Sequence, residues 1–135
     1  MLSAFKSLSI VIAAMIIVGC SSTSAEKERH LTLLAQNRAN LLASELPLEA
    51  GPLSIMRASS KGSNVEIMMV YNADAPGAKP AATVLSNSVN AYCTSADTKA
   101  NLEVGLSYRI KMRNSRGQLI ADEMVTLERC TNSTK

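Results

Sequence analysis

The sequence is short of aromatic residues and of histidine. Its 135 residues include no Trp, one Phe and three Tyr, and its single His is His30. Because Phe5 lies in the apolar N-terminal stretch, the remaining chain must build its core from aliphatic side chains, methionines and tyrosines. The length suits one domain.

Charged residues are few and dispersed. Lys and Arg number 14 against 11 Asp and Glu, for a formal net charge of +3. Nucleic-acid-binding domains normally cluster their basic residues and add stacking aromatics. The sequence also lacks a nucleophile elbow, a Gly-rich phosphate loop and a placed acid–base pair. We therefore expect no enzyme activity, cofactor, metal, small-molecule substrate or nucleic-acid partner.

The N-terminal segment has the features of a secretory signal peptide. After a positively charged start, residues 7–18 form an apolar run of 12 residues. That run is shorter than the roughly 20 residues that a membrane-spanning helix needs. Its length and position are typical of the hydrophobic region of a signal peptide, which we predict to cover residues 1–19.

The end of this segment resembles a bacterial lipobox, Ile17-Val18-Gly19-Cys20. Val18 stands where Ala or Ser is more usual. We expect acylation of Cys20 and durable membrane attachment through several acyl chains; the alternative is an ordinary signal peptide that contains a Cys. Under the usual sorting rule, Ser21 in place of Asp implies delivery to the outer membrane, with the domain facing the periplasm.

With Cys20 assigned to lipid, two cysteines remain. An exported chain meets an oxidising compartment, so Cys93 and Cys130 are predicted to form a disulfide. The bond would close a loop of about 38 residues and contribute roughly 4 kcal/mol on the chain-entropy model. The alternative is a two-cysteine metal site, which lacks further ligands because His30 lies near the N-terminal tether.

The rest of the chain is predicted to be a short flexible tether followed by one α+β domain. We place the lipidated tether at residues 20–25 and the domain at residues 26–135. The periodicities predict an antiparallel sheet of four to five strands, with helices packed on one face, in the order helix, hairpin, helix, strands. The predicted segments are a helix over 24–46, strands over 53–59 and 65–71, a helix over 80–93, and strands over 101–113 and 118–129.

The segment before residue 114 has the clearest strand pattern. Its apolar residues alternate with the basic stripe Arg109, Lys111 and Arg113, so one face should be buried and the other wet. We expect acidic residues of the last strand to pair with this stripe. The stripe is either a solvated sheet face or a surface for lipid head groups or an acidic partner.

The order of these elements resembles the AspS/GspS-beta class of type II secretion pilotins, over residues 31–130. No landmark is a catalytic signature, so the resemblance rests on order and spacing. The landmarks are Leu33-Leu34-Ala35, Leu46-Pro47, Ser59-Ser60-Lys61-Gly62-Ser63-Asn64-Val65, the helix that ends at Cys93, Tyr108-Arg109-Ile110, and Cys130.

The resemblance implies a function that composition alone does not give. Pilotins of this class bind a C-terminal segment of the secretin, carry it along the lipoprotein route and promote its assembly in the outer membrane. An unstructured tail that folds as an amphipathic helix in an apolar groove would suit this chain. Candidate contacts are Leu34, Leu41, Val89 and Tyr92, for which core packing is the competing role. The alternative function is a structural envelope lipoprotein or assembly factor with a non-secretin client.

Overall fold

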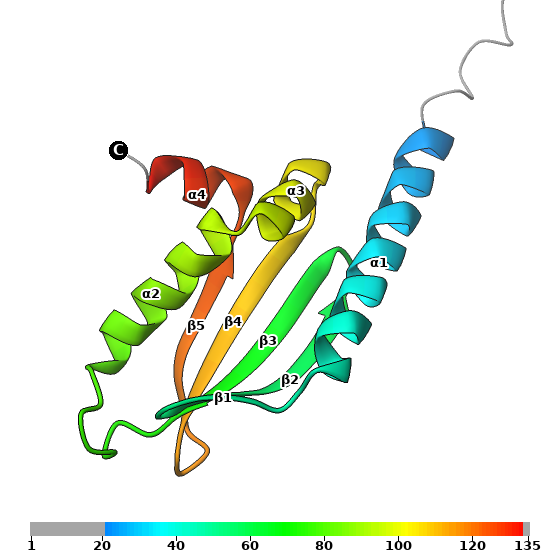
Figure 1. The fold of residues 1–135 in the computed structure, drawn as a ribbon. Coiled ribbons are helices and arrows are strands. Elements are labelled where there is room, and N and C mark those ends of the chain that lie inside the picture. Colours follow the sequence, from blue (N-terminus) through cyan, green and yellow to red (C-terminus); the bar gives the residue numbers. More distant parts are fainter. Residues whose placement is uncertain (1–20, 134–135) are drawn as a thin grey trace, which may run out of the picture.

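The computed structural model describes residues 21–133 (Figure 1). These residues form four helices and one five-stranded sheet. The elements are α1 (Ser21–Ser44), β1 (Leu48–Ala50), β2 (Leu53–Lys61), β3 (Asn64–Tyr71), α2 (Ala81–Thr94), α3 (Ala96–Val104), β4 (Ser107–Asn114), β5 (Leu119–Val125) and α4 (Leu127–Asn132). The predicted α+β class is confirmed.

The first helix packs on the sheet through one stripe of its surface. Ala35 and Ala39 are buried, and Leu31, Leu34 and Leu42 pack against the core at the same helical spacing. α1 begins at Ser21, so the segment expected to be a flexible tether is helical up to the residue that follows Cys20. Cys20 itself lies outside the described residues.

The predicted hairpin is present and is extended by a third strand. β2 and β3 pair antiparallel across a tight turn at Gly62, whose φ of 58° favours glycine. β1 pairs with the start of β2 and forms one edge of the sheet. It was not predicted, because its three residues are all exposed and too few to show a period.

One pairing in the sheet differs from the prediction. β3 and β4 are parallel, with Val65 opposite Tyr108 and Ile67 opposite Ile110, while the other neighbouring pairs are antiparallel. The chain leaves the end of β3, passes through α2 and α3, and returns to the starting end of the sheet (Figure 1). A helical crossover of this kind gives a parallel pair.

Two short helices replace the ends of predicted strands. α3 extends to Val104 and so includes the first residues of the strand that was predicted over 101–113. It ends at Gly105, whose φ is 113°. The last strand ends at Val125, because Thr126 caps the N-terminus of α4 by accepting a hydrogen bond from the Arg129 backbone N–H. The β4–β5 pairing has a bulge at Ile120, between the partners of Met112 and Arg113.

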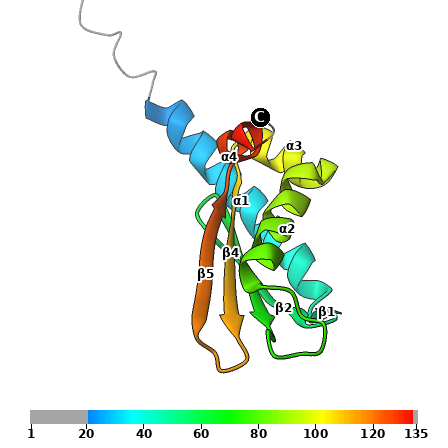
Figure 2. The ribbon, with the colours of Figure 1, turned by 90° about the vertical axis from the view of Figure 1, so that its left-hand side faces the viewer.

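The helices cover one face of the sheet and leave the other open. Figure 2 shows the sheet nearly edge-on, with α2 and α3 on one side of it. Along β3, and from Tyr108 to Met112 in β4, every second residue points to the covered face and is buried. The most deeply buried large side chains are Tyr71, Tyr108, Ile67, Met69, Ile110, Met112, Val65 and Val125.

Candidate functional site

A cleft lies between α2 and the β5–α4 segment. Its volume is about 620 Å³, within the range of protein binding sites. Apolar side chains and hydroxyl or amide groups share its walls. The lining residues are Ala82, Leu85, Ser86, Asn87, Val89, Asn90, Cys93, Thr94, Glu123, Arg129, Cys130 and Ser133.

A disulfide joins the two sides of this cleft, and an ion pair lies within the β5–α4 side. Cys93 of α2 is bonded to Cys130 of α4, with the Cα atoms 5.3 Å apart, which confirms the predicted pairing. Arg129 of α4 forms a salt bridge with Glu123 of β5. The disulfide therefore joins α4, which has no buried residue, covalently to α2.

Exposed apolar residues gather on the elements that form the α4 side of the cleft. Leu119, Ile120 and Met124 of β5 and Leu127 of α4 are each at least 40% exposed. β5 is also an edge strand, with β4 as its single neighbour among the described residues. Large apolar side chains that remain exposed near an edge are a common feature of protein-binding surfaces.

The four residues expected to contact a partner do not form one surface. Val89 lines the cleft but is only 7% exposed. Leu34 of α1 and Tyr92 of α2 are half-buried and pack against the core, and Leu41 of α1 is 62% exposed. The sequence could not locate the cleft, because it depends on how α4, an unpredicted helix, meets α2.

Tyr92 lies in a polar cluster on the covered side of the sheet. Its ring centroid is 5.3 Å from that of Tyr108, whose hydroxyl accepts a hydrogen bond from Asn101. Burial raises the pKa of Tyr92 from its ordinary value of 10.0 to about 12; Tyr108 adds to the rise and Arg38 opposes it. Arg38 Nε is buried and has no hydrogen-bond partner among the described residues.

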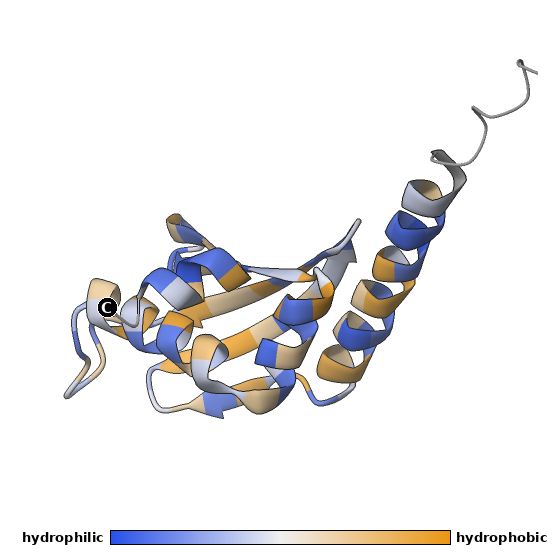
Figure 3. Cartoon of the chain, turned by 90° about the horizontal axis from the view of Figure 1, so that it is seen from above, coloured by the Kyte–Doolittle hydropathy of each residue, from blue (hydrophilic) through white to orange (hydrophobic). Residues whose placement is uncertain are grey.

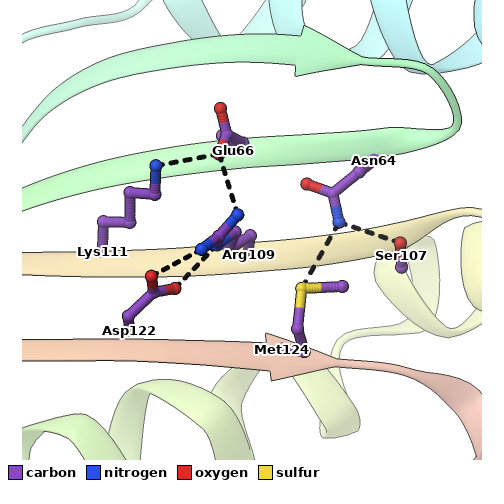
Figure 4. A network of polar contacts seen from close by, with 7 residues as sticks. All are labelled: Asn64, Glu66, Ser107, Arg109, Lys111, Asp122 and Met124. Atoms are coloured by element: carbon purple, nitrogen blue, oxygen red, sulfur yellow. Dashed lines mark hydrogen bonds and ion pairs between the residues drawn. The ribbon is translucent and has the colours of Figure 1, made fainter.

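The basic stripe lies on the open face, and acidic neighbours neutralise most of it (Figure 4). Arg109 donates two hydrogen bonds to Asp122, at 2.7 and 2.6 Å, and Lys111 Nζ lies 3.1 Å from Glu66 Oε1. The bonds from Arg109 lower the pKa of Asp122. Arg113 donates to the Gly117 carbonyl oxygen. The predicted cross-strand pairing is confirmed for Asp122, and no free cationic stripe remains.

No group of three or more His, Cys, Asp or Glu side chains within residues 21–133 is arranged to hold a metal ion. His30 is exposed, near the start of α1. Among the helices of the same residues, none is both long and apolar enough to cross a membrane.

Comparisons with known proteins identify the family. The family model described as type II secretion system pilotin, S protein, matches residues 27–130. The chain belongs to this pilotin family. Pilotins are non-enzymatic assembly factors, so the prediction that the chain is not an enzyme is confirmed.

Two pilotin structures from Vibrio resemble this pilotin closely. EpsS of Vibrio vulnificus is 58% identical with a TM-score of 0.74, over 78% of this chain and 96% of that one. AspS of Vibrio cholerae is 60% identical with a TM-score of 0.73, over 78% and 97%. A secreted protein of Pseudomonas aeruginosa shares the fold at 14% identity, with a TM-score of 0.64 over 77% and 96%. No curated protein sequence matches the chain.

Proposed function

We propose that this pilotin binds the C-terminal segment of a type II secretion secretin and promotes its targeting to, and assembly in, the outer membrane. The observation that carries the proposal is the pilotin family match over residues 27–130. The chemistry of the described residues agrees with a binding protein, since they offer a cleft and exposed apolar side chains.

The proposed location is the periplasmic side of the outer membrane, with Cys20 as the lipid anchor. The support comes from the lipobox-like Ile17-Val18-Gly19-Cys20 and from Ser21 after it. Several acyl chains give stable membrane attachment. The residues of the signal peptide and Cys20 lie outside the described part of the chain.

For the secretin segment we propose the cleft between α2 and α4 as the docking site. A disordered tail can fold as an amphipathic helix and bury its apolar side against Leu85 and Val89. The amide side chains of Asn87 and Asn90 can form hydrogen bonds with polar side chains of the helix and with the backbone groups at its ends. Leu34, Leu41 and Tyr92 remain candidate contacts; Leu41 is the most accessible of the three.

Replacing Cys20 tests the targeting role. In cells that carry Cys20→Ala, we expect both this protein and its secretin to leave the outer membrane, with the secretin channel in the inner membrane. Membrane fractionation and immunoblotting measure the distribution. A secretin that still reached the outer membrane normally would contradict the proposal and favour a structural lipoprotein with a different client.

Two alanines of α2 offer a matched test of the docking site. Ala82 and Ala91 are both exposed, but only Ala82 lines the cleft. We expect Ala82→Glu to weaken capture of a secretin C-terminal fragment at least tenfold, because it places a carboxylate in an apolar contact. Ala91→Glu should bind normally. Equal binding of the secretin fragment by both variants would show that it docks elsewhere on the domain.

A further inference from the structure

The exposed start of α1 is the basis of a further inference about how the domain is held at the membrane. Helix α1 begins at Ser21, the residue bonded to the proposed lipid-bearing Cys20. The side chains of residues 23–30 are all exposed, and packing starts at Leu31. Figure 1 shows this part of α1 extending past the end of the sheet.

The packed half of α1 fixes the direction of the exposed half. Ala35 and Ala39 are at most 2% exposed under the helix, and Leu31 lies against Gly105, where an added Cβ would be 3.3 Å from Leu31 Cδ1. Helix propagation onto an existing nucleus adds one hydrogen bond for each residue that is fixed. The exposed turns therefore continue a helix that the domain has already nucleated. Because α1 is one continuous helix, no flexible joint separates Ser21 from the packed part at Leu31.

The exposed turns have the composition of a solvated rod. Glu26, Lys27, Glu28 and Arg29 alternate in sign around the helix, without an apolar side that would lie in a bilayer surface. Figure 3 shows hydrophilic residues on these turns, clear of the other elements. Ten residues from Ser21 to His30 span about 15 Å at the α-helical rise.

We propose that residues 21–30 of α1 are a rigid spacer, which holds the domain at a fixed height and orientation above the lipid surface. The end of the domain with α3, α4 and the β2–β3 turn then faces the membrane, and the end with the β4–β5 turn faces away. This inference rests on the proposed acylation of Cys20.

The absence of Trp from the chain makes the orientation measurable. Lys99→Trp places one reporter on α3, and Arg116→Trp places one in the β4–β5 turn; both positions are exposed. The acylated full-length mature protein is reconstituted in vesicles that contain a dansyl-labelled lipid as energy acceptor. Because eight strand residues separate the two ends by about 26 Å, we expect several-fold more transfer from position 99 than from position 116.

Two replacements of residues 25–29 supply the matched controls. A Gly-Ser-Gly-Ser-Gly block removes helix propensity, whereas a block of five alanines keeps it, and both remove the same charges. The Gly/Ser protein should give nearly equal transfer from the two reporters, and the alanine protein should keep the several-fold difference. Circular dichroism and retention of the disulfide show that each domain is folded.

Three outcomes would overturn the inference. Equal energy transfer from positions 99 and 116 in the protein with its natural residues 25–29 refutes the rigid spacer. The same ratio of transfer from the two positions in the Gly/Ser and alanine variants also refutes it. Both outcomes leave the pilotin function intact. Protein that fails to float with the vesicles refutes the lipid anchor and the spacer together. Flotation is therefore measured first, so that failure of the anchor and failure of the spacer are distinguished.

Discussion

Ile67 and Met68 are neighbours in β3, yet they lie in different environments. Ile67 is 1% exposed beneath the helices, whereas Met68 is half-buried on the open face beside the ion pairs of Glu66 and Lys111. The two faces therefore differ in what they contribute to stability. Side chains on the covered face stabilise the domain by burial, whereas side chains on the open face stay in contact with water. The variants described below compare the two faces, in order of decreasing expected effect.

The disulfide is expected to be the largest single contribution on the covered side. Replacing both Cys93 and Cys130 with Ser should lower the free energy of unfolding by about 4 kcal/mol, because the unfolded chain regains the entropy of an open loop. Urea denaturation followed by circular dichroism measures the change. A reductant should destabilise the parent protein to the same degree and leave the double variant unaffected; an unchanged midpoint would contradict the prediction.

Truncation of Ile67 tests the core itself. Ile67→Ala should cost about 3 kcal/mol, because it leaves a cavity under the helices where the sheet cannot relax. Met68→Ala, one residue along the same strand, is the control and should cost about 1 kcal/mol or less. Both are measured by urea denaturation. Equal costs would show that the open face is covered in solution.

Tyr92 makes the free energy of unfolding depend on pH. Its folded-state pKa of about 12 exceeds the ordinary value of 10.0, so folding favours the neutral phenol. The resulting stabilisation, about 3 kcal/mol, is complete below pH 10 and is lost as the pH rises through about 12. Unfolding free energies between pH 9 and 12 should fall more steeply for the parent than for Tyr92→Phe. Parallel curves would refute the assignment.

The ion pairs of the open face should have the smallest effect. Glu66→Gln removes the ion pairs of Glu66 with Lys111 and with Arg109, at 3.1 and 3.8 Å, but leaves the Arg109–Asp122 pair intact. We expect a loss below about 1 kcal/mol, which added salt should reduce further because the groups are partly exposed. Glu103→Gln, outside this network, controls for the lost charge. A loss as large as that of Ile67→Ala would reverse the comparison between the two faces.

The sequence predicted the elements whose periodicity is strong. α1, the β2–β3 hairpin, α2 and the alternating part of β4 have regular apolar patterns, because each buries one face against the same core. α3 was missed because it buries only Thr98 and Leu102. Its boundaries did have a signal, since Ser95 caps its start and Gly105 ends it.

The site was less predictable than the fold. The disulfide was predicted from cysteine number and compartment, but the cleft between α2 and α4 needs the tertiary position of a six-residue helix. The parallel pairing of β3 and β4 was open to prediction. A helix between two strands of one sheet normally brings the second strand back parallel to the first.

The position of Cys130 also has a consequence for the time at which the domain is completed. Cys93 lies 37 positions earlier. During the proposed export, which starts at the N-terminus, the Cys93 thiol crosses first and waits for its partner until the intervening segment has followed. The disulfide therefore forms only after α3, β4 and β5 have crossed, and a chain truncated before residue 130 keeps a Cys93 thiol that can exchange with other disulfides.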